Sequence, residues 1–216
     1  IGDFPRIPEF TGLGQLLPEH LASLFDTRHV VTDAEYVAAQ RAWEAFRSGS
    51  AASIEACVAS GVAALPFLND ALVRLMEEFP SVTNGLSRLE QEIVERSVGA
   101  QTDLAALYTA VSRAETRPYA GDTTVWAYVN RLAQPPAPLL RVDGPGPLPL
   151  WEKRVESAQK WRVQATHEGE RVASGAQDWV HLAGIDKWIG GTHLHGPSAQ
   201  WRWDPGSGTL VRTAQN

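Results

Sequence analysis

The order of local signals between residues 86 and 175 constrains the fold more than any other feature of the chain. Three short amphipathic segments, each followed by a residue that ends a helix, precede two short β-like runs. Apolar residues recur at helical spacing in the first three segments, whereas the last two are short apolar or alternating runs. The region therefore predicts three helices followed by a β-hairpin.

The first two helices have clear starts and ends. Ser87 and Glu90 have the spacing of a capping box, and Gly99 supplies the left-handed conformation that ends many helices. Thr102 offers an N-cap for the second helix. Pro118 ends that helix because the residue before a proline disfavours the α region. We expect both helices to turn their apolar stripes toward a core.

The third helix and the hairpin complete the pattern. The helix begins at Asp122 or Thr123 and ends before Pro135. Residues 139–142 and 161–165 are the two predicted strands, and a Gly- and Pro-rich turn follows the first of them. This order is typical of a winged helix-turn-helix, a module that usually contacts DNA or a protein partner.

The signals divide the chain into three parts. Residues 1–85 are a predicted helical region, 86–175 the winged-helix-like module, and 176–216 a Trp- and His-rich β tail. We expect the helical region to form a bundle packed on the module, and the tail to pack on the module as well. The predicted fold class is mainly α with small β elements, that is, α+β.

The helical region carries its own local signals. Thr32 and Glu35 form a second capping box, ahead of a helix that places Tyr36 and Trp43 at core spacing. A later helix ends at Glu77-Glu78 and Pro80, and we expect the two glutamates to be exposed there.

The tail has a hairpin signature. Residues 199–203 and 209–212 flank a turn of Asp, Pro, Gly and Ser, and 192–195 is a candidate third strand. Four of the eight tryptophans lie in this part of the chain. Together they predict a small antiparallel sheet with an aromatic cover.

Charge argues against simple DNA binding. Residues 86–175 hold 11 Lys or Arg against 11 Asp or Glu, and the net charge of −6 comes from the first 85 residues, with 5 against 11. Phosphate contacts supply most non-specific affinity for DNA, so DNA-binding modules usually have a basic face. The third helix holds Arg131 as its one cation. The residues predicted to contact DNA or a protein partner are Arg131, Arg141, Lys153, Arg154, Lys160 and Arg162.

A second hypothesis is a small-molecule binder or enzyme with a pocket at the tail. Its predicted lining residues are Asp122, Asp186, Trp188, His193, His195 and Trp201. His193 and His195 are two apart, so on a strand both point to one face, and imidazole pairs suit zinc or copper. We expect no metal and no cofactor, because no third ligand has a fixed spacing. The sequence contains no recognised catalytic motif, and a helix N-terminus explains Asp122 without chemistry.

The cellular context follows from composition. No run of about 18 apolar residues appears, so we expect no membrane span. We find no signal peptide at the start, and the single cysteine, Cys57, cannot form an intramolecular disulfide. These features predict a cytoplasmic protein, and they leave its oligomeric state open.

Several short motifs resemble an uncharacterised bacterial protein family, a domain of unknown function with a winged-helix-like C-terminal region. The motifs that carry the resemblance are residues 12–16, 78–81, 85–87, 121–123, 184–191 and 201–204. The resemblance covers nearly the whole chain, and the 184–191 motif is fairly specific. It implies that the module is embedded in a larger unit, and that this chain lacks the family's N-terminal domain. It implies no activity.

Overall fold

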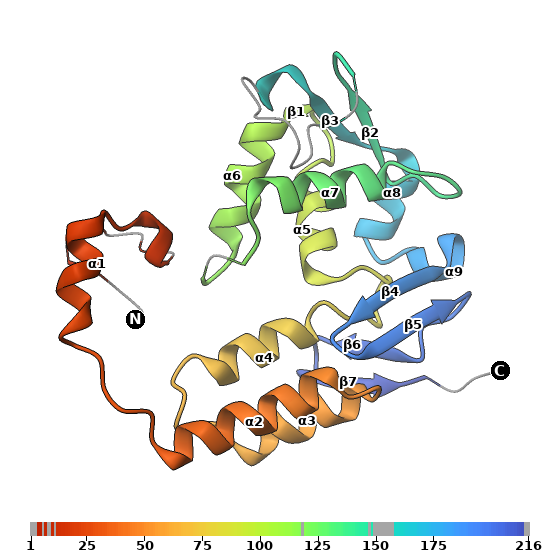
Figure 1. Ribbon diagram of the computed structural model, residues 1–216. Helices are drawn as coiled ribbons and strands as arrows, with labels where there is room; N and C mark the ends of the chain where they lie inside the picture. The colour runs from red at the N-terminus through yellow and green to blue at the C-terminus, as the bar shows by residue number, and fades with distance from the viewer. Residues whose placement is uncertain are drawn as a thin grey trace.

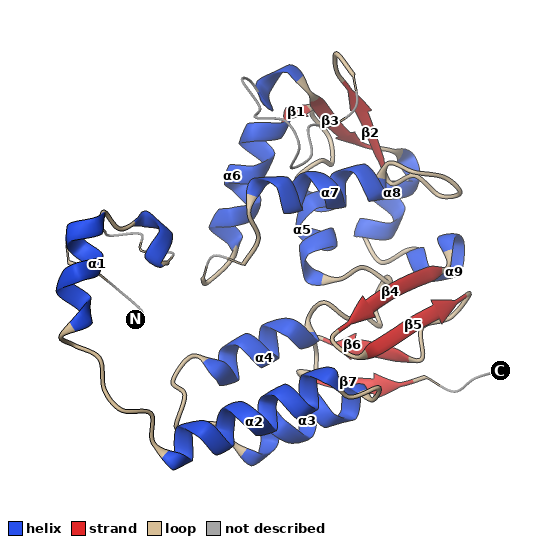
Figure 2. Ribbon diagram, viewed as in Figure 1, coloured by secondary structure: helices blue, strands red, loops and turns tan. Residues whose placement is uncertain are grey.

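Helices predominate in the protein, and its strands form small antiparallel sheets (Figure 1, Figure 2). This confirms the predicted α+β class. The computed structural model describes residues 4–5, 7, 10, 12–117, 119–146, 148 and 158–213. Within these ranges, no helix combines the length and the apolar character needed to cross a membrane.

The region predicted as a winged helix folds as a helix, a short strand, two helices and two antiparallel strands, β2 and β3, which lie at the position of the predicted wing. The strand β3 lies between β1 and β2 and is antiparallel to both. We call this region the module. Its elements, with the helix that follows them, are α5 (Arg88–Glu95), β1 (Thr102–Asp103), α6 (Leu104–Ala114), α7 (Asp122–Leu132), β2 (Leu140–Asp143), η2 (Ala158–Lys160), β3 (Arg162–Ala165), α8 (His167–Ala173) and α9 (Trp179–Ala183).

One helix start in the module differs from the prediction. Thr102 does not cap α6, because it is extended in β1, where it pairs with Val163. Asp103 is the N-cap instead, and its Oδ1 accepts a hydrogen bond from the Ala106 N–H at 2.8 Å. The short strand β1 therefore separates the first two helices, which the local signals alone did not indicate.

The module has its own apolar core. Ile93, Leu104, Val129 and Val163 come from three helices and the wing, and each is almost completely buried in this cluster. Trp179 of α9 joins the same cluster. Burial of this many aliphatic side chains supplies the main driving force for folding the module.

A second core is shared by the N-terminal helices and the C-terminal strands, and we call this unit the composite body. Its strands form two separate hairpins, β4 with β5 and β6 with β7. Its elements are α2 (Asp33–Arg47), α3 (Ala51–Ser60), α4 (Leu68–Met76), β4 (Ile185–Ile189), β5 (Thr192–Gly196), β6 (Trp201–Asp204) and β7 (Thr209–Arg212).

Side chains from both ends of the chain meet in the composite body. Ile54 and Phe79 pack in one cluster with Leu194 and Leu210. The helical region and the tail were each expected to cover the module, but their apolar faces cover each other. The bundle meets the module through polar contacts instead, which are described below.

The turn between β4 and β5 explains part of this pairing. The Gly191 N–H donates to the Phe46 carbonyl at the end of α2, at 2.7 Å. A Cβ atom at Gly190 would lie 2.3 Å from the Phe46 carbonyl oxygen, and one at Gly191 would lie 2.1 Å from the Arg47 carbonyl oxygen. The two glycines therefore allow the turn to rest directly on the helix backbone.

Two sequence expectations about the composite body were wrong. Tyr36 and Trp43 are 69% and 60% exposed, because α2 buries its alanine stripe, Ala38, Ala42 and Ala45. The strand at 192–195 does not join the last hairpin. It pairs with β4, so the tail forms two small sheets rather than one.

The N-terminal segment stands apart from both cores. It contains η1 (Leu13–Gln15) and α1 (Pro18–Phe25), and α1 buries none of its residues. Figure 1 shows α1 beside the molecule, joined to α2 by an extended stretch.

Candidate functional site

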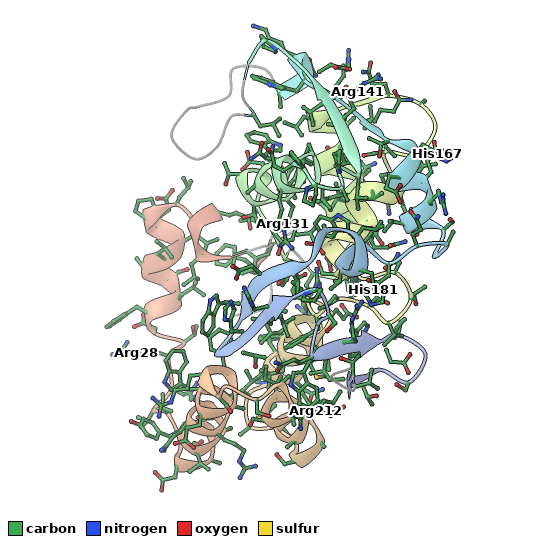
Figure 3. The ribbon with its side chains drawn as sticks, turned by 90° about the vertical axis from the view of Figure 1, so that its right-hand side faces the viewer. Arg28, Arg131, Arg141, His167, His181 and Arg212 are labelled. Carbon is green, nitrogen blue, oxygen red and sulfur yellow. The ribbon has the colours of Figure 1, made fainter. Side chains whose placement is uncertain are left out.

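The cation of the third module helix faces inward. Arg131 Nη1 lies 3.3 Å from Glu90 Oε1, and its guanidinium lies 5.2 Å from the ring centroid of Trp179. Figure 3 shows Arg131 near the middle of the molecule. The Arg131 side chain is 38% exposed, but its charge is paired with a buried carboxylate.

Two of the predicted wing cations, Arg141 and Arg162, are paired as well. Arg141 Nε lies 3.2 Å from Asp143, and Arg162 lies 3.3 Å from Asp103. Lys160 is exposed at the end of η2. Lys153 and Arg154 lie outside the described residues. The structure therefore places described acidic partners beside both wing arginines.

The outer face of α7 carries little charge. Its exposed residues are Asp122, Thr124, Ala127 and Asn130, which we call the α7 face. Asp122 lies at the start of the helix, where its Oδ1 accepts the Thr123 N–H at 2.7 Å. This face is small, polar and slightly acidic.

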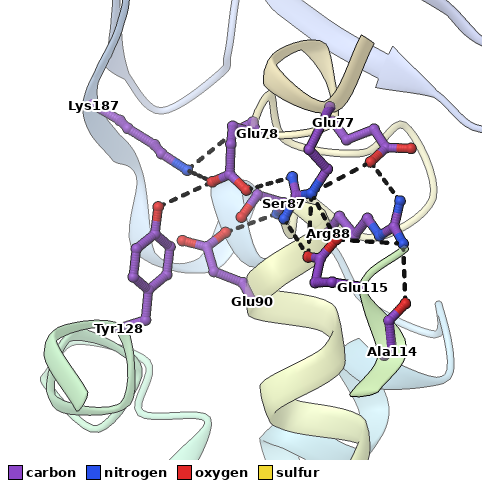
Figure 4. A network of polar contacts seen from close by, with 10 residues as sticks. Glu77, Glu78, Ser87, Arg88, Glu90, Ala114, Glu115, Tyr128 and Lys187 are labelled. Atoms are coloured by element: carbon purple, nitrogen blue, oxygen red, sulfur yellow. Dashed lines mark hydrogen bonds and ion pairs between the residues drawn. The ribbon is translucent and has the colours of Figure 1, made fainter. Parts of the chain in front are cut away.

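A buried polar cluster lies where the module meets the composite body (Figure 4). Lys187 of β4 donates to the Glu78 carbonyl at 3.0 Å and lies 3.3 Å from Glu78 Oε2. Tyr128 of α7 donates to the same oxygen at 2.9 Å. Glu90 at the start of α5 is buried beside them and accepts the Ser87 N–H at 2.7 Å.

The surroundings of Glu90 and Tyr128 shift the pKa values of these two groups. Burial works to raise the pKa of Glu90, but the charges of Lys187 and Arg131 outweigh it, and the net shift is downward. Burial, together with the negative charge of Glu78, raises the pKa of the Tyr128 hydroxyl well above its usual range. Near neutral pH Glu90 is therefore charged and the Tyr128 phenol is neutral.

A second group of ion pairs extends the cluster toward the end of α6. Arg74 of α4 lies 2.9 Å from Glu78 and 2.7 Å from Glu115. Arg88 bridges Glu77 at 2.7 Å and Glu115 at 3.6 Å. Residues from α4, α5 and the loop after α6 are thus tied together by charge. We call the whole set, with Glu78, Glu90, Tyr128, Arg131 and Lys187, the junction.

The junction contains buried charged side chains, as active sites often do, but it has no cavity that could hold a substrate. The gap lined by Glu78, Glu90, Arg131 and Lys187 is too narrow for a water molecule. A substrate could not reach the carboxylates without separating the two units. The junction therefore acts as a connector between the module and the composite body.

Sequence reasoning missed most of the junction. Glu77-Glu78 was expected at an exposed helix end, but Glu78 is only 3% exposed because Lys187, from 109 residues later, covers it. Glu90 carried a local signal as half of a capping box. Lys187 and Tyr128 carried no local signal, because their shared partner, Glu78, is distant from both in sequence.

The residues of the predicted tail pocket are only partly brought together. Asp186, Trp188, His193 and His195 share the outer face of the β4–β5 hairpin. Trp201 packs against the core of the composite body from a different sheet.

The four residues on the hairpin are in direct contact. The rings of Trp188 and His193 are stacked with centroids 4.3 Å apart and planes 2° apart. His193 Nε2 lies 2.8 Å from Asp186 Oδ1, and this hydrogen bond holds the pKa of Asp186 below its usual value. His195 lies 5.6 Å from the His193 ring. The result is an exposed aromatic surface rather than a pocket.

Metal binding finds limited support here. In the part of the chain that the structure describes, no three His, Cys, Asp or Glu side chains are grouped closely enough to hold a metal ion. The histidine pair by itself supplies two ligands, fewer than the four that a structural zinc site uses.

Comparisons with protein-family models, with curated proteins and with solved structures gave no match to this chain. The resemblance to an uncharacterised bacterial family therefore stays a prediction.

Proposed function

We propose that this is a non-catalytic winged-helix protein whose module contacts another protein rather than DNA. The observation that carries the proposal is the pairing of Arg131 with the buried Glu90. It leaves the α7 face, the surface that would enter the major groove, without a free cation among its described residues.

Electrostatics favours a protein partner for this face. Each phosphate contact normally needs a Lys or Arg, and the paired arginines of the wing would have to give up Asp143 and Asp103 to supply one. A small helix face with one charged residue can instead pack against an apolar or polar protein surface at little desolvation cost. A buried, unpaired thiol at Cys57 is in keeping with a cytoplasmic setting for this contact.

The test has two arms. In the first, the protein is used to select sequences from random duplex DNA at low and then at physiological salt, and we expect no enriched motif. An enriched motif that survives physiological salt would overturn the proposal, because it would establish sequence-specific DNA binding.

In the second arm, a photo-crosslinking amino acid replaces Ala127 on the α7 face in cells of the source organism. Ala39, an exposed alanine of α2, is the matched control position. We expect one discrete protein adduct from position 127, absent at 39 and lost when Asn130→Arg is added. Adducts that are identical at both positions would contradict a specific contact through α7.

A second candidate function rests on the stacked pair Trp188 and His193, which presents an exposed aromatic surface. Such a surface can stack a planar ligand such as a nucleobase. Titration with adenosine should then shift the Trp188 indole resonance in the wild type and not in Trp188→Leu. An unchanged indole resonance would discard this function.

A further inference from the structure

Two imidazoles share the outer face of the β4–β5 hairpin. His193 and His195 are two residues apart in β5, so their side chains leave the sheet on the same side. Both residues are exposed, and their ring centroids lie 5.6 Å apart. Among the described residues, His195 contacts the His193 ring and makes no hydrogen bond. Its ring nitrogens are therefore available to a ligand from solution.

The spacing of the two rings suits a single zinc ion. Zn–N bonds in proteins are about 2.0–2.1 Å long, and the angles at a structural zinc ion are tetrahedral. Two imidazoles bound to one ion then have ring centroids about 5 Å apart. The observed separation of 5.6 Å differs from this value by no more than a small side-chain rotation can supply. His193 and His195 can therefore reach the same ion.

Asp186 holds His193 in a form that can bind a metal ion. Its Oδ1 lies 2.8 Å from His193 Nε2. A carboxylate only accepts hydrogen bonds, so Nε2 of the neutral ring donates and Nδ1 keeps its lone pair. Trp188 stacks on the same ring at 4.3 Å between centroids and restricts its rotation. Metal-binding histidines commonly have a carboxylate on their second nitrogen, which orients the ring and raises its basicity.

One chain supplies half of a zinc site. Among the described residues, no third His, Cys, Asp or Glu side chain is grouped with the pair to hold a metal ion, whereas a structural zinc site uses four ligands. A second copy carries the same two imidazoles, and a two-fold axis through the ion would bring four nitrogens together. The charges also balance, since one Asp186 carboxylate from each copy offsets the double charge of zinc.

The surface around the pair suits contact between two copies. Trp188 is 65% exposed and lies directly opposite His193 in the register of the hairpin. An exposed indole beside the ligands offers apolar area to the same surface of a second copy, and aromatic side chains are enriched in such interfaces. Burial of the indole would add to the stability of the zinc-bound pair.

We propose that this face binds one zinc ion between two copies of the chain, through His193 and His195 of each copy. Asp186 is a positioning residue that orients His193, and Trp188 packs beside the ion. Neither copy has a complete site, so zinc binding and dimer formation are linked. The dimer would present two α7 faces to a partner. That consequence rests on the function proposed above, whereas the zinc site does not.

Sedimentation velocity of the full chain tests the proposal. The protein is purified without a histidine tag, freed of metal with EDTA and titrated with zinc chloride. We expect a monomer that becomes a dimer, complete at one zinc ion per two chains and reversed by EDTA. A protein that stays monomeric in excess zinc, a dimer that forms equally without zinc, or one zinc ion bound per chain would each overturn the proposal.

Histidine variants provide the matched test. His195→Ala removes one ligand from each copy and should abolish the zinc-dependent dimer. His167 is an exposed histidine of α8 in the module (Figure 3), so His167→Ala should dimerise like the wild type. Circular dichroism checks that both variants keep the fold, which we expect because both side chains are at the surface. Dimerisation of His195→Ala at wild-type zinc concentrations, or an equal loss in both variants, would contradict the site.

Asp186→Asn isolates the positioning role. The loss of a carboxylate behind a ligand histidine typically weakens metal binding by about 10–100-fold, and we expect a loss of this size with the stoichiometry unchanged. Competition with a chromogenic chelator measures the affinity. Asp70→Asn, at an exposed position in α4, is the control and should bind zinc like the wild type. Unchanged affinity in Asp186→Asn, or equal losses in both variants, would contradict the role of Asp186. No residue of the α7 face takes part, so the function proposed above and this site can fail separately.

Discussion

The module and the composite body differ in how far apart along the chain their core residues lie. The module is built from one continuous stretch, 86–179, whose helices and wing follow each other closely. The composite body joins 42–79 to 180–210 and so closes a loop around the whole module. Local contacts form quickly and distant ones late. The module therefore has the organisation of a folding unit that brings the two halves of the composite body together.

The junction is where the two units depend on each other, and breaking it should have the largest effect. Glu90→Ala removes the buried carboxylate that pairs with Arg131, and it leaves Lys187 with Glu78 as its remaining carboxylate partner. We expect the free energy of unfolding to fall by about 3–5 kcal/mol in a denaturant titration.

Glu92→Ala is the matched control for the junction. Glu92 lies on the same helix, but it forms a more accessible pair with Arg96 at 2.6 Å. Its loss should cost about 0–1 kcal/mol. Similar losses for Glu90→Ala and Glu92→Ala would mean that the junction contributes no more than a surface ion pair.

Substitutions that create a cavity allow the stability of the two cores to be compared directly. Leu194 in the composite body and Leu107 in the module are 0% and 1% exposed. Each change to alanine should lower the free energy of unfolding by about 2–5 kcal/mol in a denaturant titration. A loss below about 1 kcal/mol for Leu194→Ala would indicate that the shared core is not tightly packed.

The outer face of the β4–β5 hairpin should matter much less for stability. Trp188 and His193 are directly opposite each other in the register and are stacked. A double-mutant cycle with Trp188→Ala and His193→Ala should give a coupling energy of about 0.2–1 kcal/mol. Zero coupling would show that the stack makes no net contribution in solution.

The smallest expected effect concerns pH and the start of α2. The predicted capping box forms, with the Thr32 N–H donating to Glu35 Oε2 at 2.8 Å, and this bond together with His29 lowers the pKa of Glu35 from 4.5 to about 2. A carboxyl group whose pKa is lower in the folded than in the unfolded chain stabilises the fold at pH values above its unfolded pKa. The contribution should therefore disappear as the pH falls from 4.5 to about 2.

Thermal melts between pH 6 and pH 2 check this prediction. The wild type should lose its advantage over Glu35→Gln as the solution becomes acidic, whereas its difference from Glu44→Gln on the same helix should change less. A wild-type advantage that is constant across the whole range would contradict the role of Glu35.

The comparison between the two units also shows what the sequence could predict. Caps and helix ends are local, so the α+β class, the three module helices and the wing could be predicted from residues such as Glu90, Gly99 and Pro135. The composite body could not, because nothing near Leu194 indicates that it will meet Ile54.

In the candidate site too, contacts between residues close in sequence could be predicted, and contacts between distant residues could not. Arg131 was a reasonable DNA contact as the one cation of its helix, but its role depends on Glu90, 41 residues earlier, and on Trp179. The face of a helix that turns inward is set by tertiary packing. By contrast, Trp188 and His193 were grouped correctly because strand alternation places nearby residues on one face.

The most direct test of the two-unit account is hydrogen exchange by mass spectrometry on Leu194→Ala and Leu107→Ala. In Leu194→Ala, exchange should rise in α3, which is more than 130 residues away in sequence, as well as in the C-terminal strands, while α6 stays protected. Leu107→Ala should give the reverse pattern. If α3 kept its protection in Leu194→Ala, or if all elements opened equally in both variants, the composite body would not be a separate unit.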